Sequence, residues 1–317
     1  MVTLEKIKAR IFKKTPAVKS GNGLFVTIDE LIAERKNAAY IRGLNTRLTT
    51  SRQAGDVKSA FKGRGMEFEE IRAYNFGDDV RDIDWRVTAR KLNPYTKLYA
   101  EEKDREIYVL LDLSPAMRFG TRKELKSVAA AKIAALLGWL SLENKDRFGC
   151  IIFDGRESYI FKPQNHKNSL LAIFKKIAEI SQNSLRQPSE ETLPAAKAVQ
   201  LLQKSLKSYA TVFVISDFIN MDDAQKRAMA ALARRARVYF INVFDVLEEV
   251  APRAGEYMIE NRGDDLVFDS RPQAFQEAYR SYFAAQRSEI KDFCHKFLCN
   301  YIEVRTDIEL YKQLKIG

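Results

Sequence analysis

The sequence is poor in the residues that most often carry catalysis or covalent cross-links. It contains 2 histidines and 3 cysteines in 317 residues. A small, odd number of cysteines gives no disulfide framework, and no charged-then-apolar secretion signal opens the chain. We therefore expect a reducing, cytoplasmic location.

Long apolar runs are also missing. The most apolar stretch, residues 128–140, is interrupted by Lys132 and is shorter than the roughly 20 residues that a membrane-spanning helix needs. The chain also lacks the Gly-x-x-x-x-Gly-Lys-Ser/Thr loop that cradles nucleotide phosphates. These absences argue against a transmembrane protein and against a chain that hydrolyses ATP alone.

The scarcity of histidine limits the forms of catalysis that are open. A serine or cysteine nucleophile needs a nearby base, and neither His166 nor His295 lies in a recognisable triad motif. Cys294 and Cys299 flank His295, but three ligands are fewer than the four of a usual structural zinc site. We therefore expect these residues to have packing roles, and we expect no catalytic residue.

Positive charge is in excess, and the excess is concentrated near the N-terminus. The formal net charge is +11, and residues 1–65 carry 14 Lys or Arg against 5 Asp or Glu. Clustered basic residues attract nucleic acids, anionic membranes or acidic proteins. One interpretation is a basic leader that is solvated or docks on an acidic protein. The alternative is a nucleic-acid or anionic-membrane binding module.

This leader contains one clear helix signal. Thr27 and Glu30 have the spacing of a capping box, and apolar residues follow at helical intervals. We expect a helix over residues 28–44. The polar, basic stretch 49–65 predicts a connector. On this basis residues 1–62 form a basic leader with one helix and a flexible connector.

From residue 105 onward, short apolar runs alternate with amphipathic stretches. The runs are too continuously apolar for half-exposed strands and suit a sheet buried on both faces. They cover residues 107–112, 148–153, 211–217 and 238–244. Helices are expected over residues 123–142, 168–180, 193–206, 222–235 and 272–297. This alternation predicts a doubly wound, mainly parallel α/β sheet over residues 105–317, to which residues 300–304 add an edge strand.

Hydroxyl and carboxylate side chains follow several of these strands. Asp112 and Ser114 come at the end of the first strand, Asp217 ends a later one, and Thr192 lies just before a helix. Ligands of open α/β sheets lie outside the carboxyl ends of the strands, so we expect these four side chains at one edge. Such oxygen ligands suit Mg²⁺. The alternative is that each residue only caps its own turn or helix.

The sequence Asp112-Leu-Ser114-Pro-Ala116, with Thr192 and Asp217, resembles the metal-ion-dependent adhesion site of von Willebrand factor A domains. The pattern of that site is Asp-x-Ser-x-Ser with a distant Thr and Asp. The resemblance implies a von Willebrand factor A-like fold and a Mg²⁺ site. Ala116 stands where the family has its second serine. We therefore expect a degenerate site that binds Mg²⁺ weakly or not at all.

The densest motif of the chain precedes the sheet. Acidic residues alternate there with arginines and large aromatic side chains. The motif residues are Glu67, Arg72, Tyr74, Asp78, Asp79, Arg81, Asp84, Trp85 and Arg90. Arg–Asp pairs gain geometric definition beside aromatics, so we expect residues 63–104 to form a rigid strap on the α/β domain. The alternative is a metal hydrolase built on the acidic cluster; the interspersed arginines argue against it, because they lower carboxylate pKa values.

The motif succession G-x-G-x-E-F, R-x-Y, G-D-D-x-R-x-I-D-W and T-A-R in this segment strongly resembles the domain of unknown function 58 family. The resemblance extends over about residues 59–314. Members of that family are typically associated with MoxR-type AAA+ ATPases. The resemblance therefore implies a non-enzymatic protein-recognition adaptor that works with such an ATPase and its client protein in assembly, maturation or chaperone-like remodelling.

Overall fold

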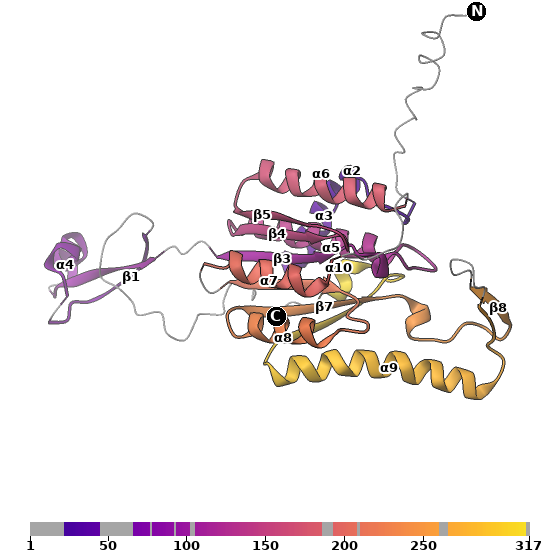
Figure 1. Cartoon of the computed structure of the whole chain (residues 1–317). Coiled ribbons are helices and arrows are strands. Elements are labelled where there is room, and N and C mark those ends of the chain that lie inside the picture. Colours follow the sequence, from indigo (N-terminus) through magenta and orange to yellow (C-terminus); the bar gives the residue numbers. More distant parts are fainter. Residues whose placement is uncertain are drawn as a thin grey trace, which may run out of the picture. The chain divides into compact units, whose positions relative to one another are not determined.

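The computed structural model of the chain divides into two compact units (Figure 1). The α/β unit comprises Met1–Leu44 and Glu106–Ile316, and the motif module comprises Asn45–Arg105 together with Gly317. The residues that the structure describes are 22–44, 66–76, 78–91, 93–101, 105–185, 193–207, 210–259 and 266–314. The two units are described separately below.

A six-stranded sheet forms the centre of the α/β unit (Figure 1). Its strands are β3 (Glu106–Asp112), β4 (Arg147–Phe153), β5 (Ser158–Gln164), β6 (Thr211–Ser216), β7 (Arg237–Phe244) and β10 (Asn300–Arg305). They lie in the order β10-β7-β6-β3-β4-β5, and only the β4–β5 pair is antiparallel. This is the strand order of a doubly wound fold. The predicted α/β class, the mainly parallel sheet and the edge strand near residue 300 are confirmed.

The central strands are apolar on both faces, which explains their burial. Leu110 of β3 pairs in register with Ile151 of β4 and with Val214 of β6, and all three side chains are buried. The strand at the β5 edge differs, because its residues are mostly exposed or partly buried. It contains Lys162 and Pro163, which suit a sheet edge. The sequence analysis did not predict this strand.

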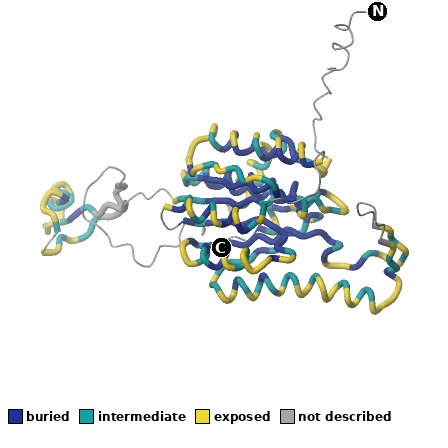
Figure 2. Tube along the Cα trace, viewed as in Figure 1, coloured by how far each residue is buried: buried dark blue, intermediate teal, exposed yellow. Residues whose placement is uncertain are grey.

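Helices cover both faces of the sheet. On one face lie α7 (Ala195–Ser205), α8 (Asp223–Ala233) and α9 (Gln273–Lys296), and on the other lies α5 (Lys126–Glu143). Most of α5 is buried, because α6 (Lys167–Ser184), α2 (Ile28–Ala33) and α3 (Arg35–Leu44) pack over its outer side (Figure 2). A helix that is apolar all round belongs in such a position.

The helix predicted for the leader is present as two consecutive helices, α2 (Ile28–Ala33) and α3 (Arg35–Leu44). The predicted capping box begins α2. The Thr27 hydroxyl accepts from the backbone N–H of Glu30 at 3.3 Å, and the Glu30 carboxylate accepts from the N–H of Thr27 at 2.9 Å. This box satisfies N–H groups that the first helical turn leaves free.

These two helices belong to the α/β unit and not to a separate leader. Val26 and Leu31 are completely buried, and the indole Nε1 of Trp139 in α5 donates to the Leu31 carbonyl at 3.1 Å. The boundary predicted at residue 62 is therefore corrected: residues 22–44 pack on the α/β core. The correction follows from apolar residues of the leader that complete the outer side of α5.

Smaller elements complete the α/β unit. The hairpin of β8 (Glu256–Ile259) and β9 (Leu266–Asp269) stacks its Tyr257 and Phe268 rings in line with Phe275 of α9. The short helix α10 (Leu310–Gln313) packs against α3 and α5. Among the described residues, no helix is both long enough and apolar enough to cross a membrane.

The motif module is a small antiparallel hairpin with a helix. β1 (Met66–Ala73) pairs with β2 (Tyr95–Glu101), and a 3-10 turn (Val80–Asp82) and α4 (Trp85–Lys91) lie between them in the chain. Thr96 of β2 is fully buried and bridges to Ile83. The arrangement of this module as a strap on the α/β unit stays a prediction.

Candidate functional site

An aspartate stands at the carboxyl end of each of four neighbouring strands. Asp112 ends β3, and β4, β6 and β7 are followed by Asp154, Asp217 and Asp245. Each carboxylate accepts a hydrogen bond from the backbone N–H two residues further on, at 2.8 to 3.2 Å. The four side chains therefore hold tight turns at one edge of the sheet. The sequence analysis singled out Asp112 and Asp217 only, although the same strand-then-aspartate signal marks all four.

Asp112 lies at this edge with both carboxylate oxygens engaged. Its Oδ1 accepts from the N–H of Ser114 at 2.9 Å, and its Oδ2 accepts from the Ser216 hydroxyl at 2.6 Å. Burial, and after it the nearby Asp217 carboxylate, raises the pKa of Asp112 to about 6. The structure thus brings Asp112, Ser114 and Asp217 together as predicted. Thr192, the fourth predicted residue, lies outside the described residues.

A lysine ammonium lies among the acidic residues of this edge. Lys126 is the first residue of α5 and is 1% exposed. Its Nζ donates to Asp217 Oδ2 at 2.7 Å and to Glu248 Oε1 at 2.6 Å. Burial acts to lower the pKa of this ammonium, but the two carboxylates outweigh it and raise the pKa above its ordinary value. Lys126 is therefore held in its charged form.

Glu248 connects this lysine to a second buried network. In a capping box after β7, Glu248 Oε2 accepts from the N–H of Asp245 at 2.8 Å. Asp245 is completely buried and accepts from the Thr121 N–H, the Thr121 hydroxyl and the Thr306 hydroxyl at 2.6 to 3.0 Å. Thr121 precedes α5, and Thr306 follows β10. One network therefore ties the ends of β6, β7 and β10 to the start of α5.

The sequence analysis missed Lys126, Asp245 and Glu248. The spacing of Asp245 and Glu248 after an apolar run is that of a capping box, so this pair could have been found. Lys126 carries no such signal. Lysines are rarely buried, so a lysine at the end of an apolar helix is normally interpreted from sequence as a solvent-exposed residue.

The backbone of the loop after Asp217 is strained. Phe218 and Asn220 both have φ of 53°, in the left-handed region that non-glycine residues mostly avoid. The Phe218 ring is buried edge-on against Phe240, and the N–H of Asn220 donates to Gln286 Oε1 of α9 at 3.0 Å. Such strain persists only where the surroundings hold it, and it clusters at functional sites.

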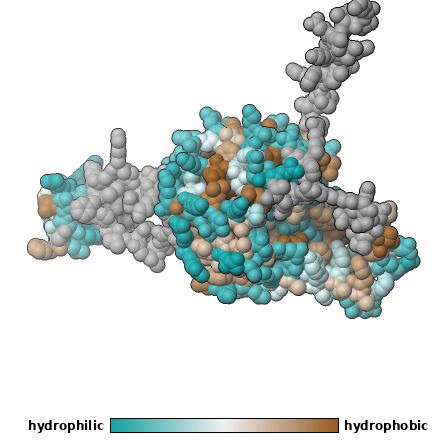
Figure 3. All heavy atoms as spheres, in the orientation of Figure 1, coloured by the Kyte–Doolittle hydropathy of each residue, from teal (hydrophilic) through white to brown (hydrophobic). Residues whose placement is uncertain are grey.

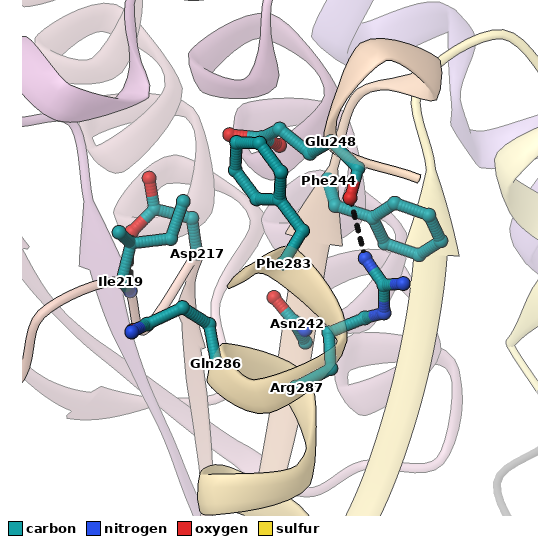
Figure 4. A pocket seen from close by; sticks show the side chains of 8 residues that line it. All are labelled: Asp217, Ile219, Asn242, Phe244, Glu248, Phe283, Gln286 and Arg287. Atoms are coloured by element: carbon teal, nitrogen blue, oxygen red, sulfur yellow. Dashed lines mark hydrogen bonds between the residues drawn. The ribbon is translucent and has the colours of Figure 1, made fainter. Parts of the chain in front are cut away.

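A small pocket opens beside this strained loop (Figure 4). Its lining residues are Asp217, Ile219, Asn242, Phe244, Glu248, Phe283, Gln286 and Arg287. The Arg287 guanidinium of α9 donates to the Glu248 carbonyl at 2.6 Å. Asn242 is 2% exposed and its Nδ2 donates to the Tyr301 hydroxyl, whereas its Oδ1 finds no donor among the described residues. Asn242 Oδ1 is therefore a buried acceptor behind the pocket surface and is not exposed to a partner.

The described side chains at this edge do not fit a Mg²⁺ ion. Mg²⁺ takes six oxygens at about 2.1 Å in near-octahedral geometry. All four carboxylate oxygens of Asp112 and Asp217 already accept hydrogen bonds, one of them from a fixed ammonium, and Ala116 offers no hydroxyl. Across the described part of the chain, no group of three or more His, Cys, Asp or Glu side chains could hold a metal ion.

In the motif module, the predicted residues form ion pairs and caps. The Arg72 guanidinium contacts Asp78 Oδ1 at 2.8 Å, and Asp78 Oδ2 accepts from the N–H of Asn75 at 2.9 Å. The Tyr74 hydroxyl donates to the Asp78 carbonyl at 3.2 Å. The Asn75 hydrogen bond, and then Arg72, lowers the pKa of the Asp78 carboxyl below its ordinary value. Asp78 therefore serves as the anchor of this turn.

Two further acidic residues of the motif are helix caps. Asp79 accepts from the N–H of Arg81 at the 3-10 turn, and Asp84 accepts from the N–H of Val87 at the start of α4. The Val87 hydrogen bond lowers the pKa of Asp84, and Lys97 at 3.3 Å adds to it. A hydrolase of the acid–base kind needs paired carboxylates whose pKa values are driven apart. The lowered values at Asp78 and Asp84 do not favour that chemistry.

The remaining motif residues lie on the surface or in a strand. Glu67 is in β1 and pairs in register with Ala100. Arg81, Trp85 and Arg90 are exposed. Large apolar side chains are exposed at Phe76, Val80 and Trp85, and Figure 3 shows hydrophobic atoms on the surface of this module. We call these three residues the apolar tip.

The three thiols are not activated for catalysis. Burial raises the pKa of Cys150 far above its ordinary value, that of Cys294 to about 12 and that of Cys299 to about 11. The thiolate is the nucleophilic form, so these thiols are protonated and unreactive near neutral pH. Cysteine therefore supplies no nucleophile.

The fold and this edge define an α/β protein with a polar, internally bonded site at the carboxyl ends of its strands. The family model described as "Protein of unknown function DUF58" matches residues 70–289, and the chain belongs to that family. Uncharacterized protein Rv1480 of Mycobacterium tuberculosis and uncharacterized protein Mb1516 of Mycobacterium bovis are each 26% identical to it over 254 residues. These alignments cover 80% of this chain and 78% of each relative.

Solved structures with some likeness to the chain include two from Bacteroides. The conserved hypothetical protein BatB of Bacteroides thetaiotaomicron is 18% identical, with a TM-score of 0.36, over 66% of this chain and 93% of that one. An aerotolerance-related membrane protein of Bacteroides fragilis is 16% identical, with a TM-score of 0.40, over 66% and 95%. A likeness of this size supports no statement about function.

Proposed function

We propose that this protein is a non-enzymatic protein-recognition adaptor with a von Willebrand factor A-like fold. It works in the cytoplasm with a MoxR-type AAA+ ATPase and its client protein, in chaperone-like assembly or maturation. The doubly wound strand order supports the fold. The motif resemblance that pointed to the ATPase lies within the family to which the chain belongs.

The preorganised pocket at the carboxyl edge carries this proposal. It lies where ligands of open α/β sheets bind, and its walls are fixed before any partner arrives. Lys126 holds Asp217 and Glu248, and Gln286 holds the strained loop. Fixed walls reduce the ordering cost of association, so a small site of this kind can add useful affinity and specificity.

The surface of the pocket carries the partly buried polar side chains of Gln286 and Arg287. The Asn242 Oδ1 atom below it is buried, and both oxygens of Asp217 and of Glu248 already accept hydrogen bonds. The space inside the pocket is about 10 Å³, roughly what one water molecule needs, so we expect the partner to cover the pocket from outside and contact Gln286 and Arg287. An acidic side chain of the partner, which a Mg²⁺ site would attract, is not expected here, because the nearby carboxylates of Asp217 and Glu248 would repel it.

The engagement of the candidate catalytic groups supports recognition over catalysis. Asp112 has a raised pKa, but both of its carboxylate oxygens accept hydrogen bonds. Within the described residues, the thiols are protonated and the motif carboxylates are engaged as caps. His166 begins α6 as its N-cap, and His295 lies in the last turn of α9. Neither histidine lines the pocket.

An adaptor needs two contact surfaces, and the motif module offers the second. The apolar tip places Phe76, Val80 and Trp85 in solvent on a hairpin that ion pairs and caps hold in shape. Aromatic side chains at such tips are frequent anchors of protein interfaces. The pocket and the tip would thus contact two different partners, the ATPase and its client.

Calorimetric titration with the MoxR-type ATPase of the same organism tests the proposal. The ATPase is used without nucleotide, because its own Mg²⁺–nucleotide complex would otherwise respond to chelator. We expect saturable association in Mg²⁺ and in chelator alike. No association in either condition, at concentrations up to about 1 mM, would contradict the adaptor function.

A further inference from the structure

A full positive charge is buried at the carboxyl edge, on the first residue of the otherwise mostly apolar helix α5. The side chain of Lys126 is 2% exposed, and those of its partners Asp217 and Glu248 are 6% and 7% exposed. Removing a charge from water is costly unless it is paired and fully hydrogen-bonded. Replacing a whole buried ion-pair network with apolar side chains of similar volume is often neutral or stabilising, so the presence of this lysine with its two carboxylates points to a role in the site.

The two carboxylates depend on this lysine. Asp217 Oδ2 and Glu248 Oε1 converge on one nitrogen, at 2.7 and 2.6 Å. Burial raises the pKa of Glu248, the lysine opposes that rise, and the Asp217 carboxylate adds to it. Without a cation between them, two buried negative charges would repel each other at short range.

Each carboxylate uses its second oxygen to hold a loop. Asp217 Oδ1 accepts from the N–H of Ile219, and Glu248 Oε2 accepts from the N–H of Asp245. The lysine therefore links the loop after β6 to the loop after β7, and these loops form the pocket wall. The position of the cation controls the shape of the recognition site.

We infer that Lys126 supplies, as a fixed ammonium, the positive charge that adhesion-type sites take from a divalent cation. The connection from β3 to α5 has an alanine at position 116, where the site would need a hydroxyl, and it ends in this lysine. Asp217 and Glu248 are therefore bridged, and the loops that carry them are held, without metal. Metal-independent binding of a partner rests on the proposed function, whereas the bridging of these two carboxylates by Lys126 does not.

A metal-binding measurement on the full chain tests the inference first. Mn²⁺ serves as the probe, because its electron paramagnetic resonance signal separates free from bound ion. We expect no saturable Mn²⁺ binding to the wild type and the same thermal midpoint in Mn²⁺ and in chelator. One Mn²⁺ bound per chain, and lost in Asp112→Asn, would overturn the inference.

Unfolding of two charge variants tests it second. Lys126→Met keeps the length of the side chain but leaves both carboxylates unpaired, and we expect its thermal midpoint in chelator to fall by roughly 10 °C. The double variant Lys126→Met/Glu248→Gln removes one of the two stranded charges and should recover part of that loss. Equal midpoints for wild type and Lys126→Met, or for the single and double variants, would overturn the inference.

A lysine just before the same helix is the matched control. Lys123 pairs with Glu309 at 2.8 Å, and the two side chains are 40% and 53% exposed, so Lys123→Met should lower the midpoint less than Lys126→Met. If Lys126→Met does not fold, the Mn²⁺ measurement on the wild type decides. Neither measurement uses the ATPase, so a failure of the proposed function leaves both results standing.

Discussion

The carboxyl edge of the sheet and the motif module contain the same kinds of residue in opposite environments. At the edge, Lys126 and Asp245 are almost completely buried and bonded to partners from distant strands. In the module, the Arg72–Asp78 and Lys97–Asp84 pairs join residues within one short hairpin at a partly exposed surface. Charge at the edge therefore fixes tertiary structure, whereas charge in the module fixes local turns.

The comparison teaches that a dense sequence motif need not mark the most constrained site. The module carries the recognisable succession of glycine, arginine and aspartate residues, yet exposed ion pairs contribute little to stability. The edge is built from single residues spread from Asp112 to Thr306. The contribution of these residues to stability can be judged only when their burial and their hydrogen-bond partners are known.

The largest effect is expected at Asp245. The Asp245 carboxylate accepts hydrogen bonds from several donors. In Asp245→Asn one of its oxygens becomes an N–H₂ group, which must face some of those donors. Two or more buried hydrogen bonds would be lost, which costs about 3 kcal/mol of unfolding free energy. Urea unfolding followed by the fluorescence of buried Trp139 measures this, with Trp85→Phe as background to remove the second tryptophan.

Asp222→Asn is the matched control for that change. Asp222 is an exposed N-cap of α8 and accepts from the N–H of Gln225. Asparagine caps helices about as well as aspartate, so the loss should stay below about 1 kcal/mol. Equal losses at the two positions would contradict the contrast between the buried edge and the exposed surface.

A smaller, pH-dependent effect is expected from the same buried carboxylate. Burial acts to raise the pKa of Asp245, but hydrogen bonds from Thr121, Leu247 and Thr306 outweigh it and hold the pKa below 3.8. A lowered pKa stabilises the fold above pH 3.8, and this contribution is lost as the pH falls through the folded-state value. The difference between wild type and Asp245→Asn should therefore shrink between pH 5 and pH 2 in urea unfolding. A constant difference would speak against an ionised Asp245.

Almost no stability effect is expected at the apolar tip. Trp85 is 66% exposed, so Trp85→Ser should change the unfolding free energy of the chain by no more than about 0.5 kcal/mol. Differential scanning calorimetry measures this. A loss of 2 kcal/mol or more would show that the tip is covered in the folded chain, and would remove it as a surface for partners.

The structure also sharpens the test of the alternative function, binding of nucleic acid or anionic membrane through the basic leader. Deleting residues 1–65 would remove α2 and α3, which pack on the core, so the informative deletion ends at residue 21. If the leader binds polyanions, this deletion should weaken DNA or anionic-vesicle binding and flatten its salt dependence. We expect no such binding by the wild type at 150 mM salt, as measured by fluorescence anisotropy. Tight, salt-sensitive binding that is lost on deletion would favour the alternative.

Much of the fold could be predicted from periodicity. Apolar runs separated by amphipathic stretches located five of the six strands of the central sheet, and a two-residue signal located the start of α2. The strand β5 was missed because an exposed edge strand lacks a continuous apolar run. The boundary at residue 62 was misplaced because the leader's core contacts involve few residues, such as Leu31, within a polar background.

The candidate site was predicted only in outline. Strand-ending aspartates locate an edge from sequence, because parallel strands end side by side. Contacts between residues of separate loops cannot be predicted from the sequence in the same way. Nothing near Lys126 in the sequence indicates Asp217 or Glu248, since their contact exists only after α5 and the ends of β6 and β7 pack together.

The most direct test of the account is whether the carboxyl-edge pocket binds the ATPase. Gln286→Trp covers the pocket with a bulky side chain from α9, and Ala285→Trp adds the same bulk at the exposed neighbouring position. In calorimetric titrations with the nucleotide-free ATPase, in chelator, we predict at least about tenfold weaker binding, or 1.4 kcal/mol, for Gln286→Trp and unchanged binding for Ala285→Trp. Equal affinity of both variants and the wild type would contradict recognition at this edge.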